Sequence, residues 1–576
     1  MQSSNGKAFQ LFCLLLFVIV LFVNQLFCIE ARANSSLNLR VTGSALPVEA
    51  TFKFPSPLPV IPQDGERNFG KGKIDLEGLE VIQVSISAST SQRIWRTFEN
   101  GPDNKGVSIF QPINLPNGFS TLGFYAQPNN RMLFGWVLVA KDLSGNSLRQ
   151  PLDYIQVGNT NSLPVKQDGP AFFWQPLCPN GYEAVGLFVT TSPQKPPQES
   201  ISCVGSHLTE QSEADTWVWK LEGIISFSSL KPVNRGTEAT GVYTGTFTFQ
   251  QQNFPPPSLS CLKNRKFYLS NMPSQDQLRP LFQTYSPFIY FHPEEEFLPS
   301  SIDWFFSNGA LLYQKGNESN PVHVQPNGSN LPQGGSDDDS YWLDYPADKN
   351  AREKVKRGDL KNTKVYLHIK PMFGGTFTDI VVWIFSPFNG DARLKILFVK
   401  SLSLGDVGEH IGDWEHVTLR ISNFNGELWR VYFSEHSGGS LVEACDLEFQ
   451  NGNKPVVYSS LHGHAMFSRA GLVLQGQDGN GLRNDMARSD KLLDAGVGYE
   501  VVAGPGIREP PWVNYFRKWG PIIRYDVEKS IDGIAKTLPA VLRKRFRELV
   551  HSIPPEVLQE MGPTGPKVKR SWSADE

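Results

Sequence analysis

The stretch FQPINLPNGFSTLG, residues 110–123, decides the fold of the first half of the chain, because it returns as WQPLCPNGYEAVG at residues 174–186. In each copy Pro fixes φ and Asn-Gly tolerates positive φ, so the Pro-Asn-Gly triplet predicts a tight turn. Apolar runs of strand length follow the turns, at residues 135–140 and 186–191. A β unit that occurs twice implies a core shared between its copies. We therefore predict a repeated β domain, built as a sandwich or a prism.

Composition extends this prediction to the whole chain, which we expect to be mainly β. The 50 Gly, 42 Pro and 38 Phe among 576 residues favour many short strands joined by tight turns. A chain of this length exceeds one ordinary core. Consecutive prolines at residues 255–257 force an extended backbone and mark the best candidate for a linker. We expect an N-terminal repeated β domain at 34–253, a linker at 254–275 and a C-terminal β-sandwich domain at 276–576.

Charge argues against one class of partner. The 54 Lys and Arg residues stand against 57 Asp and Glu, a net charge of −3, so the chain lacks the basic excess that drives binding to a phosphate backbone. We expect no nucleic-acid partner.

The N-terminus is typical of a secretory signal peptide. It has a charged Lys7, an apolar run from Leu11 to Val23 and the small-residue exit Ala31-Arg32-Ala33. Cleavage at the end of this segment, residues 1–33, predicts a secreted, extracellular or vacuolar protein. The alternative is an uncleaved membrane anchor, although Asn24-Gln25 interrupts the apolar run. No other stretch of the sequence is apolar enough to cross a membrane.

Removal of this leader would leave Cys178, Cys203, Cys261 and Cys445, an even number that suits an oxidising compartment. Four cysteines allow three pairings; the short separation of Cys178 and Cys203 favours that pair first, and four unpaired thiols are the alternative. Secretion also suits glycosylation, for which acceptor sequons begin at Asn34, Asn317 and Asn327.

The C-terminus changes from strand to helix. Pro539 can open a helix, apolar residues then recur at helical spacing among Arg and Lys, and Pro554-Pro555 ends the pattern. The apolar positions are Leu542, Phe546, Leu549 and Val550. A basic amphipathic helix can lie on a membrane, but packing against its own domain is the commoner arrangement and the one we expect.

The candidate site begins with the cluster HIGDWEH at residues 410–416. Its second part alternates as a strand does, which places Asp413 and Glu415 on one face and Trp414 and His416 on the other. Two carboxylates on one face repel each other unless a cation or hydrogen-bond donors lie between them. His410 precedes them across a glycine and can fold back to supply a nitrogen ligand.

Further histidines follow two later apolar strands, in turns that carry Glu435, His436, His462 and His464. Five of the ten histidines of the chain lie between residues 410 and 464. This concentration favours a composite metal site at strand ends. Mixed His and carboxylate ligands suit Mg²⁺, Mn²⁺ or Zn²⁺, and Ca²⁺ fits if water and carbonyl oxygens complete the shell.

A structural alternative stays open. His462 and His464 would then be hydrogen-bonded groups at a strand end, and Glu415 would pair with Arg420 or Arg430. The sequence contains no Gly-x-Ser-x-Gly nucleophile elbow and no His-Glu-x-x-His helix in this region.

Several longer phrases resemble one family of plant proteins, labelled vacuolar protein sorting-associated protein sixty-two. They are GPDN at residues 101–104, YAQPNN at 125–130, WIF with PFNG at 383–390 and GPTGPK at 562–567. The resemblance covers nearly the whole chain after the leader and implies no defined activity. The repeated phrase also resembles the β repeats of vacuolar protein sorting thirteen lipid-transfer proteins, where they form an adaptor-binding module. That resemblance implies recognition rather than catalysis.

Residues 409–415 resemble the Gly-His-Arg-His-Asp-Trp-Glu heptad of necrosis-inducing, ethylene-inducing-peptide-like proteins. These are secreted β-sandwich proteins that bind a divalent cation and plant sphingolipid headgroup sugars. The resemblance places His410, Asp413 and Glu415 at ligand positions, and His464 matches a further histidine that follows a Val-Tyr strand. It therefore implies a metal site at His410, Asp413, Glu415 and His464.

The heptad is not reproduced in full. Glu409, Ile411 and Gly412 replace three of its residues, and an upstream aspartate ligand has only Asp391 and Asp406 as candidates. The resemblance covers this patch alone, so we do not infer cytolytic activity from it.

We therefore expect a recognition protein of the secretory pathway that binds a divalent cation and a glycan or glycolipid headgroup. One alternative is a metal-dependent hydrolase, with His416, His436 or His462 as acid or base. Another is a membrane-trafficking adaptor related to vacuolar protein sorting.

Overall fold

The computed structural model describes residues 48–98, 105–266, 269–436, 438–521, 527–551 and 563–575. The expected signal peptide, residues 1–33, and the sequon at Asn34 lie outside these residues. From Glu49 onward the chain forms one unit of continuous contacts, and the expected linker at 254–275 falls inside it. The division into two domains stays a prediction. No helix in the described parts of the chain is both long and apolar enough to cross a bilayer.

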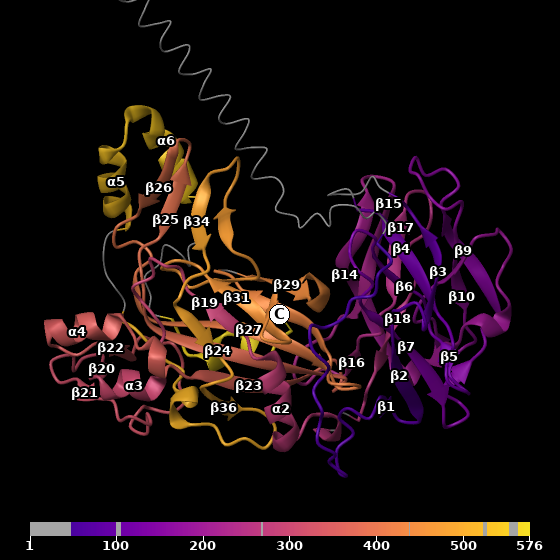
Figure 1. Cartoon of the computed structure of the whole chain (residues 1–576), viewed down its shortest axis with the longest axis horizontal. Coiled ribbons are helices and arrows are strands. Elements are labelled where there is room, and N and C mark those ends of the chain that lie inside the picture. Colours follow the sequence, from indigo (N-terminus) through magenta and orange to yellow (C-terminus); the bar gives the residue numbers. More distant parts are fainter. Residues whose placement is uncertain are drawn as a thin grey trace, which may run out of the picture. The chain divides into compact units, whose positions relative to one another are not determined.

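The chain is mainly β, as expected, and β1 to β18 form the group of strands drawn from indigo to magenta in Figure 1. Its sheets are β1 (Lys73–Asp75), β2 (Leu79–Ser85), β7 (Trp136–Asp142) and β5 (Ser120–Thr121); β3 (Ser91–Arg96), β4 (Val107–Pro112) and β6 (Tyr125–Pro128); β12 (Phe188–Thr190), β10 (Phe172–Leu177) and β9 (Asp153–Asn159); β11 (Tyr182–Glu183), β13 (Cys203–Gly205) and β8 (Leu148–Arg149); and β16 (Gly241–Val242), β18 (Ser260–Lys263), β14 (Thr209–Leu221), β15 (Ile225–Pro232) and β17 (Phe247–Gln251).

The repeated phrase folds the same way in both copies. After β4 and after β10, a backbone hydrogen bond from the aromatic residue to the proline carbonyl closes the Pro-Asn-Gly turn. The turn glycines, Gly118 and Gly181, both have φ of +83°, the conformation for which glycine was expected. The copies meet at their closing glycines, since a Cβ added to Gly123 would lie 2.8 Å from Cα of Gly186. They therefore share a core, as predicted.

One cysteine pair bridges the second copy to β13. Cys178 and Cys203 form a disulfide, which confirms the pairing favoured by their separation. Cys261 is buried and unpaired, and Cys445 is half-buried and unpaired.

The described residues of the second half form four further sheets. They are β29 (Gly439–Glu443), β28 (Leu428–Ser434), β27 (His410–Ser422), β24 (Phe377–Asn389), β23 (Val365–Met372) and β36 (Tyr499–Ala503); β30 (Phe449–Gln450), β31 (Lys454–Ser459), β19 (Phe288–Tyr290) and β35 (Leu492–Asp494), with β32 (Met466–Phe467) beside β31; β21 (Val322–His323), β20 (Leu311–Gln314) and β22 (Tyr341–Asp344); and β26 (Val399–Ser403), β25 (Arg393–Ile396), β34 (Gly481–Met486) and β33 (Gly471–Gln475).

The six-stranded sheet around β24 and β27 is buried on both faces. On one face, residues such as Val382 and Leu419 join the main core, and on the other Trp383 and Trp414 join a cluster rich in tryptophan. Strand β19 adds a parallel pairing between distant segments, with Phe288 opposite Val456 of β31. Two parallel strands need a long connection between them, and the segment between β19 and β31 provides it.

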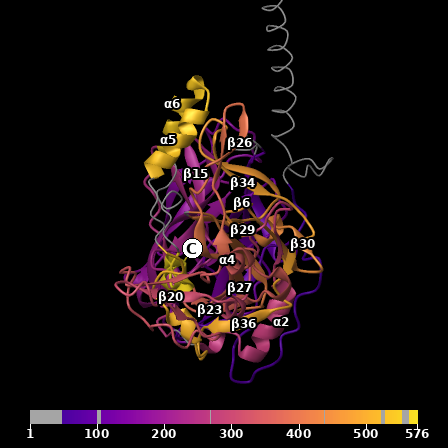
Figure 2. The same cartoon turned by 90° about the vertical axis from the view of Figure 1, so that its left-hand side faces the viewer.

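The described residues also contain five α-helices: α2 (Gln275–Tyr285), α3 (Ile302–Ser307), α4 (Lys349–Lys356), α5 (Val527–Thr537) and α6 (Ala540–His551). Helix α6 begins directly after Pro539, and its four predicted apolar positions are buried. Figure 2 shows α5 and α6 side by side, and their apolar residues form a core with Leu394 and Ile396 of β25. The helix therefore packs against its own domain, as expected.

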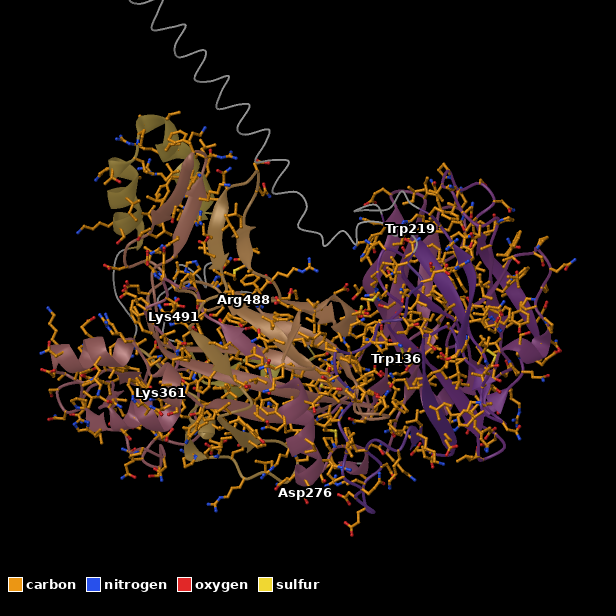
Figure 3. The ribbon with its side chains drawn as sticks, in the orientation of Figure 1. Trp136, Trp219, Asp276, Lys361, Arg488 and Lys491 are labelled. Carbon is orange, nitrogen blue, oxygen red and sulfur yellow. A yellow bond between two sulfur atoms is a disulfide. The ribbon has the colours of Figure 1, made fainter. Side chains whose placement is uncertain are left out.

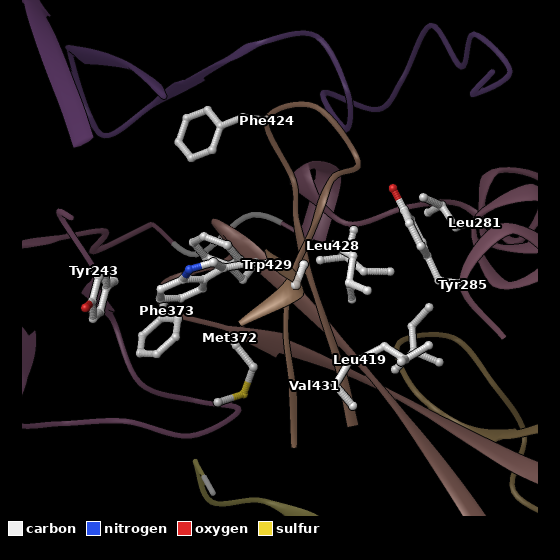
Figure 4. Close-up of a cluster of buried hydrophobic side chains, with 14 of the residues drawn as sticks. Tyr243, Leu281, Tyr285, Met372, Phe373, Leu419, Phe424, Leu428, Trp429 and Val431 are labelled. Carbon is white, nitrogen blue, oxygen red and sulfur yellow. The ribbon is translucent and has the colours of Figure 1, made fainter. Parts of the chain in front are cut away.

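The first and second halves share an apolar core. Trp219 belongs to the core of the first half alone, whereas Trp136 packs against Trp429 of β28 with ring centroids 5.2 Å apart (Figure 3). Tyr243 packs against the same Trp429 at 4.9 Å, and Figure 4 shows both rings among the side chains of the sheet. Burial of these large aromatic rings stabilises the contact between the halves.

Candidate metal and ligand cavity

The alternation predicted for residues 413–421 is that of strand β27. The strand pairs with β24 in a single register, from His410 opposite Asn389 to Ser422 opposite Phe377. Trp414 is fully buried and stacks on Trp512 at 5.5 Å. Because neighbouring side chains of a strand point to opposite faces, Asp413 and Glu415 lie away from this cluster and line a cavity.

His410 reaches the same cavity because Gly412 reverses the alternation. Strict alternation would put His410 and Asp413 on opposite faces, yet both line the cavity, while Ile411 and Trp414 share the apolar cluster. Gly412 has φ of +69°, a left-handed conformation. Trp519 also packs closely on this glycine, since an added Cβ would lie 2.7 Å from its carbonyl oxygen.

The cavity has a volume of about 250 Å³. Its wall combines residues 408, 410, 413 and 415, at and just before the start of β27, with five other segments: residues 389–393 from the end of β24 to the start of β25, His436 after β28, Leu461 and Gly463 of one turn, residues 482–484 of β34, and the C-terminal residues Pro563 and Lys569. Most of the side chains in this wall are polar or charged. It is therefore suited to a polar ligand rather than to an apolar one.

His410 has the orientation of a nitrogen ligand. Its Nδ1 donates to the carbonyl oxygen of Gly412 at 3.0 Å, which leaves Nε2 as the ring atom available to a ligand. Burial lowers the pKa of His410, so the neutral imidazole that metal binding requires is favoured.

Asp413 is held by His464. The distance from Nδ1 of His464 to Oδ2 of Asp413 is 2.9 Å, and Nε2 lies 2.8 Å from the carbonyl oxygen of Phe297. Burial lowers the pKa of His464, but the hydrogen bond to Asp413 and the charge of Glu295 raise it to about 9. Both ring nitrogens of His464 therefore face acceptors, and in its protonated form the ring orients Asp413.

The charge of His464 also acts on Asp413. Burial raises the pKa of Asp413, but the hydrogen bond from His464 and the charge of His464 bring it below its ordinary value. Asp413 is therefore a carboxylate at neutral pH, with Oδ1 left for a further partner.

Glu415 is the second carboxylate of the cavity. Ser434 of β28 donates a hydrogen bond to its Oε2. Burial, together with the charge of Asp413, raises the pKa of Glu415 to about 8. Neither arginine considered as a partner reaches it: Arg420 pairs with Asp379 and Asp575, and Arg430 with Glu443 and Asp215.

The other histidines are distributed differently. His436 lines the cavity, with Nε2 2.8 Å from Oδ1 of Asn484. His462 lies beside the cavity, with Nδ1 2.5 Å from Oδ1 of Asp391. His416 is on the opposite face of β27, where its ring lies 4.5 Å from that of Trp383. Of the three candidates for an acid or base, only His436 is part of the wall.

The sequence did not point to Lys569, Ser434 or Asn484 as parts of the site. Ser434 and Asn484 lie on strands whose pairing no local pattern discloses. Lys569 follows the phrase GPTGPK, whose only signal was family resemblance.

The imidazole of His410 and the carboxyl groups of Asp413 and Glu415 are donor types that fit a divalent cation. In this structure they lie side by side in the cavity wall. In the described parts of the chain, no three His, Cys, Asp or Glu side chains are close enough together to form a ready-made metal site. Binding of an ion would therefore draw His410, Asp413 and Glu415 toward one another.

Residues 48–576 match the family model described as vacuolar protein sorting-associated protein 62. No curated protein matches the chain. Among solved structures, GNIP1Aa from Chromobacterium piscinae matches at 17% identity and a TM-score of 0.25, over 35% of this chain and 40% of that chain. NLPPya in complex with mannosamine matches at 13% identity and a TM-score of 0.19, over 38% and 75% of the two chains. Necrosis and Ethylene inducing Protein 2, from the causal agent of cocoa's witches' broom disease, matches at 14% identity and a TM-score of 0.19, over 33% of this chain and 68% of that chain.

Proposed function

Since the chain belongs to the vacuolar protein sorting-associated protein 62 family, across residues 48–576, we propose that it is a recognition protein of the secretory pathway. Its cavity binds a divalent cation through His410, Asp413 and Glu415, and a sugar or lipid headgroup beside the ion. The Cys178–Cys203 disulfide supports the compartment, because such bonds persist where the surroundings are oxidising.

The observation that carries the cation site is that each donor residue is fixed by one atom and has another to offer. Gly412 accepts from Nδ1 of His410, His464 holds Oδ2 of Asp413, and Ser434 holds Oε2 of Glu415. Such outer partners are the usual means by which proteins orient metal ligands. In this proposal His464 positions Asp413 rather than binding the ion.

The donor set favours Mn²⁺, Mg²⁺ or Zn²⁺, since it mixes one imidazole with two carboxylates; Ca²⁺ would need added oxygen ligands. A volume of about 250 Å³ is close to the lower limit of small-molecule sites, which suits one sugar ring or headgroup. Asn389, Arg393 and Arg483 in the wall carry donors for hydroxyl or anionic oxygens.

The test is elemental analysis of the purified protein, followed by titration calorimetry with Mn²⁺. We expect one ion per chain in the wild type and none in the double variant Asp413→Ala, Glu415→Ala. Asp406→Ala, which removes an exposed carboxylate outside the cavity wall, should retain the ion. An unchanged metal content in the double variant contradicts the proposal.

A metal-dependent hydrolase is a second candidate, and the position of His436 favours it. Burial lowers the pKa of His436, so its neutral ring is placed in the cavity wall to accept a proton from an attacking water. A bound cation would supply Lewis acidity to such a reaction. Turnover of phosphoester or glycoside substrates that is lost in His436→Ala, with the cation still bound, would favour hydrolysis over recognition.

A further inference from the structure

The C-terminal segment, residues 563–575, is attached to the six-stranded sheet through buried charges. Asp575 pairs with Arg420 at 2.6 Å and with Arg235 of the first half at 3.1 Å. Lys370, which is fully buried in β23, donates to the carbonyl oxygens of Ser571 and Ala574 at 2.8 and 2.9 Å. Buried cations need such partners, so the segment is held firmly in place.

An aromatic contact adds to this anchor. The ring of Trp572 stacks on that of His368 in β23, with centroids 3.9 Å apart and an interplanar angle of 23°. Residues 570–575 are thus fixed on the sheet by charge, by hydrogen bonds and by stacking. The backbone of Lys569, directly before them, has little freedom to move away.

This anchor places the ammonium of Lys569 in the cavity. Lys569 lines the wall together with His410, Asp413 and Glu415, and its Nζ donates to the carbonyl oxygen of Trp414 at 2.6 Å. Trp414 is the residue between the two carboxylates. Lys567, two residues earlier in the same segment, instead pairs with Glu509 and donates to Asn514, outside the cavity wall.

We propose that Lys569 is a built-in competitor of the divalent cation, and that docking of the C-terminal segment sets the cation affinity of the cavity. This inference rests on the cation binding proposed above. The ammonium already offsets part of the negative charge of Asp413, and it repels a dication that enters the same small, partly dehydrated space. Cation binding is therefore weaker while the segment is docked than after it is released.

The same geometry gives the segment a regulatory role. A ligand or partner that displaces Trp572 and Asp575 from the sheet also withdraws Lys569 from the cavity. By linkage, a cation bound at Asp413 and Glu415 loosens the docked segment to the same degree.

The first test compares Mn²⁺ affinity of the full chain by titration calorimetry in the wild type, Lys569→Met and Lys567→Met. Lys569→Met keeps the length of the side chain and removes its charge, so we expect Mn²⁺ to bind at least tenfold more tightly. Lys567→Met, the matched control in the same segment, should bind as the wild type does. Equal or weaker binding by Lys569→Met overturns the inference.

The second test releases the anchor at a distance from the cavity. Asp575→Asn removes the charge that pairs with Arg420 and Arg235, and we expect severalfold tighter Mn²⁺ binding together with faster amide hydrogen exchange across residues 565–574. Faster exchange without tighter binding overturns the inference, even if Lys569→Met fails to fold.

The two proposals fail differently. Absence of Mn²⁺ binding in the wild type and in every variant removes the cation site itself, and the inference with it. Binding in all proteins with no difference among them removes only the role of Lys569.

Discussion

Gly412 shows how one residue determines the composition of the site. Its left-handed backbone lets His410 join Asp413 on one side of β27, and its missing side chain makes room for Trp519. Both requirements favour glycine, because a Cβ here would strain the backbone and would clash with Trp519. The position therefore connects the packing of the tryptophan cluster to the arrangement of the proposed ligands.

We predict that Gly412→Ala destabilises the protein by about 2 to 5 kcal/mol, because left-handed strain and a steric clash add. Gly405→Ala is the matched control: its φ of +64° is similar, but nothing lies within 4 Å of an added Cβ. Its cost should be only about 1 to 2 kcal/mol. Urea denaturation measures both, and equal costs would show that contact with Trp519 is unimportant.

For single residues, the sequence predicts the direction of a side chain well where that direction depends only on neighbouring residues. Asp413 and Glu415 share a face because a strand has a period of two, and the burial of Trp414 on the other face follows from the same rule. Lys569 could not be found this way. Its place depends on where the C-terminal segment docks, and that is decided by ion pairs with residues far apart in the sequence.

Helix α6 illustrates the same contrast for an element. Its start and its buried residues follow from the proline before it and from the helical period, and the structure agrees. Pro554-Pro555, which the sequence predicts to end it, lies outside the described residues. Its contact with β25 did not follow, because a stripe of apolar residues specifies a buried face but no particular partner.

We predict that Phe546→Ala, at a fully buried position of α6, costs about 3 to 5 kcal/mol and detaches α5 and α6 from β25. Val541→Ala, at a position of the same helix that is 73% exposed, should stay within about 0.5 kcal/mol of the wild type. Thermal denaturation with hydrogen exchange over residues 540–551 measures the difference. Similar behaviour of the two variants would contradict the observed packing.

In the molecule as a whole, a charge network accompanies the aromatic contact between the two halves. Glu443 of β29 pairs with Arg131 at 2.9 Å and with Arg430 at 3.2 Å, and Arg430 lies 3.5 Å from Asp215 of β14. All four side chains are largely buried. Loss of one member would leave an uncompensated charge in the interior.

We predict that Glu443→Gln destabilises the protein by about 3 to 5 kcal/mol at neutral pH. Burial raises the pKa of Glu443, but the charges of Arg131 and Arg430 bring it below the ordinary 4.5. A lowered folded-state pKa gives stability that is present above pH 4.5 and is lost as the pH falls through the lower value. The difference between wild type and variant should therefore shrink on acidification below that pH.

Urea denaturation at a series of pH values measures this difference. Glu222→Gln is the control, because Glu222 is 78% exposed and its pair with Lys220 lies on the surface. It should change stability by less than about 0.5 kcal/mol at every pH. A constant gap between the wild type and Glu443→Gln across the acid range would contradict the network.

The parallel pairing of β19 with β31 has a consequence for the biosynthesis of the protein. Phe288 leaves the ribosome well before its partner Val456, and at about 5 to 20 residues per second the delay is on the order of ten seconds. During that time an apolar strand has an unpaired edge in a crowded environment. Chaperones that shield such edges are therefore expected to determine the yield of the second half, and a nascent chain stalled before β31 is expected to aggregate.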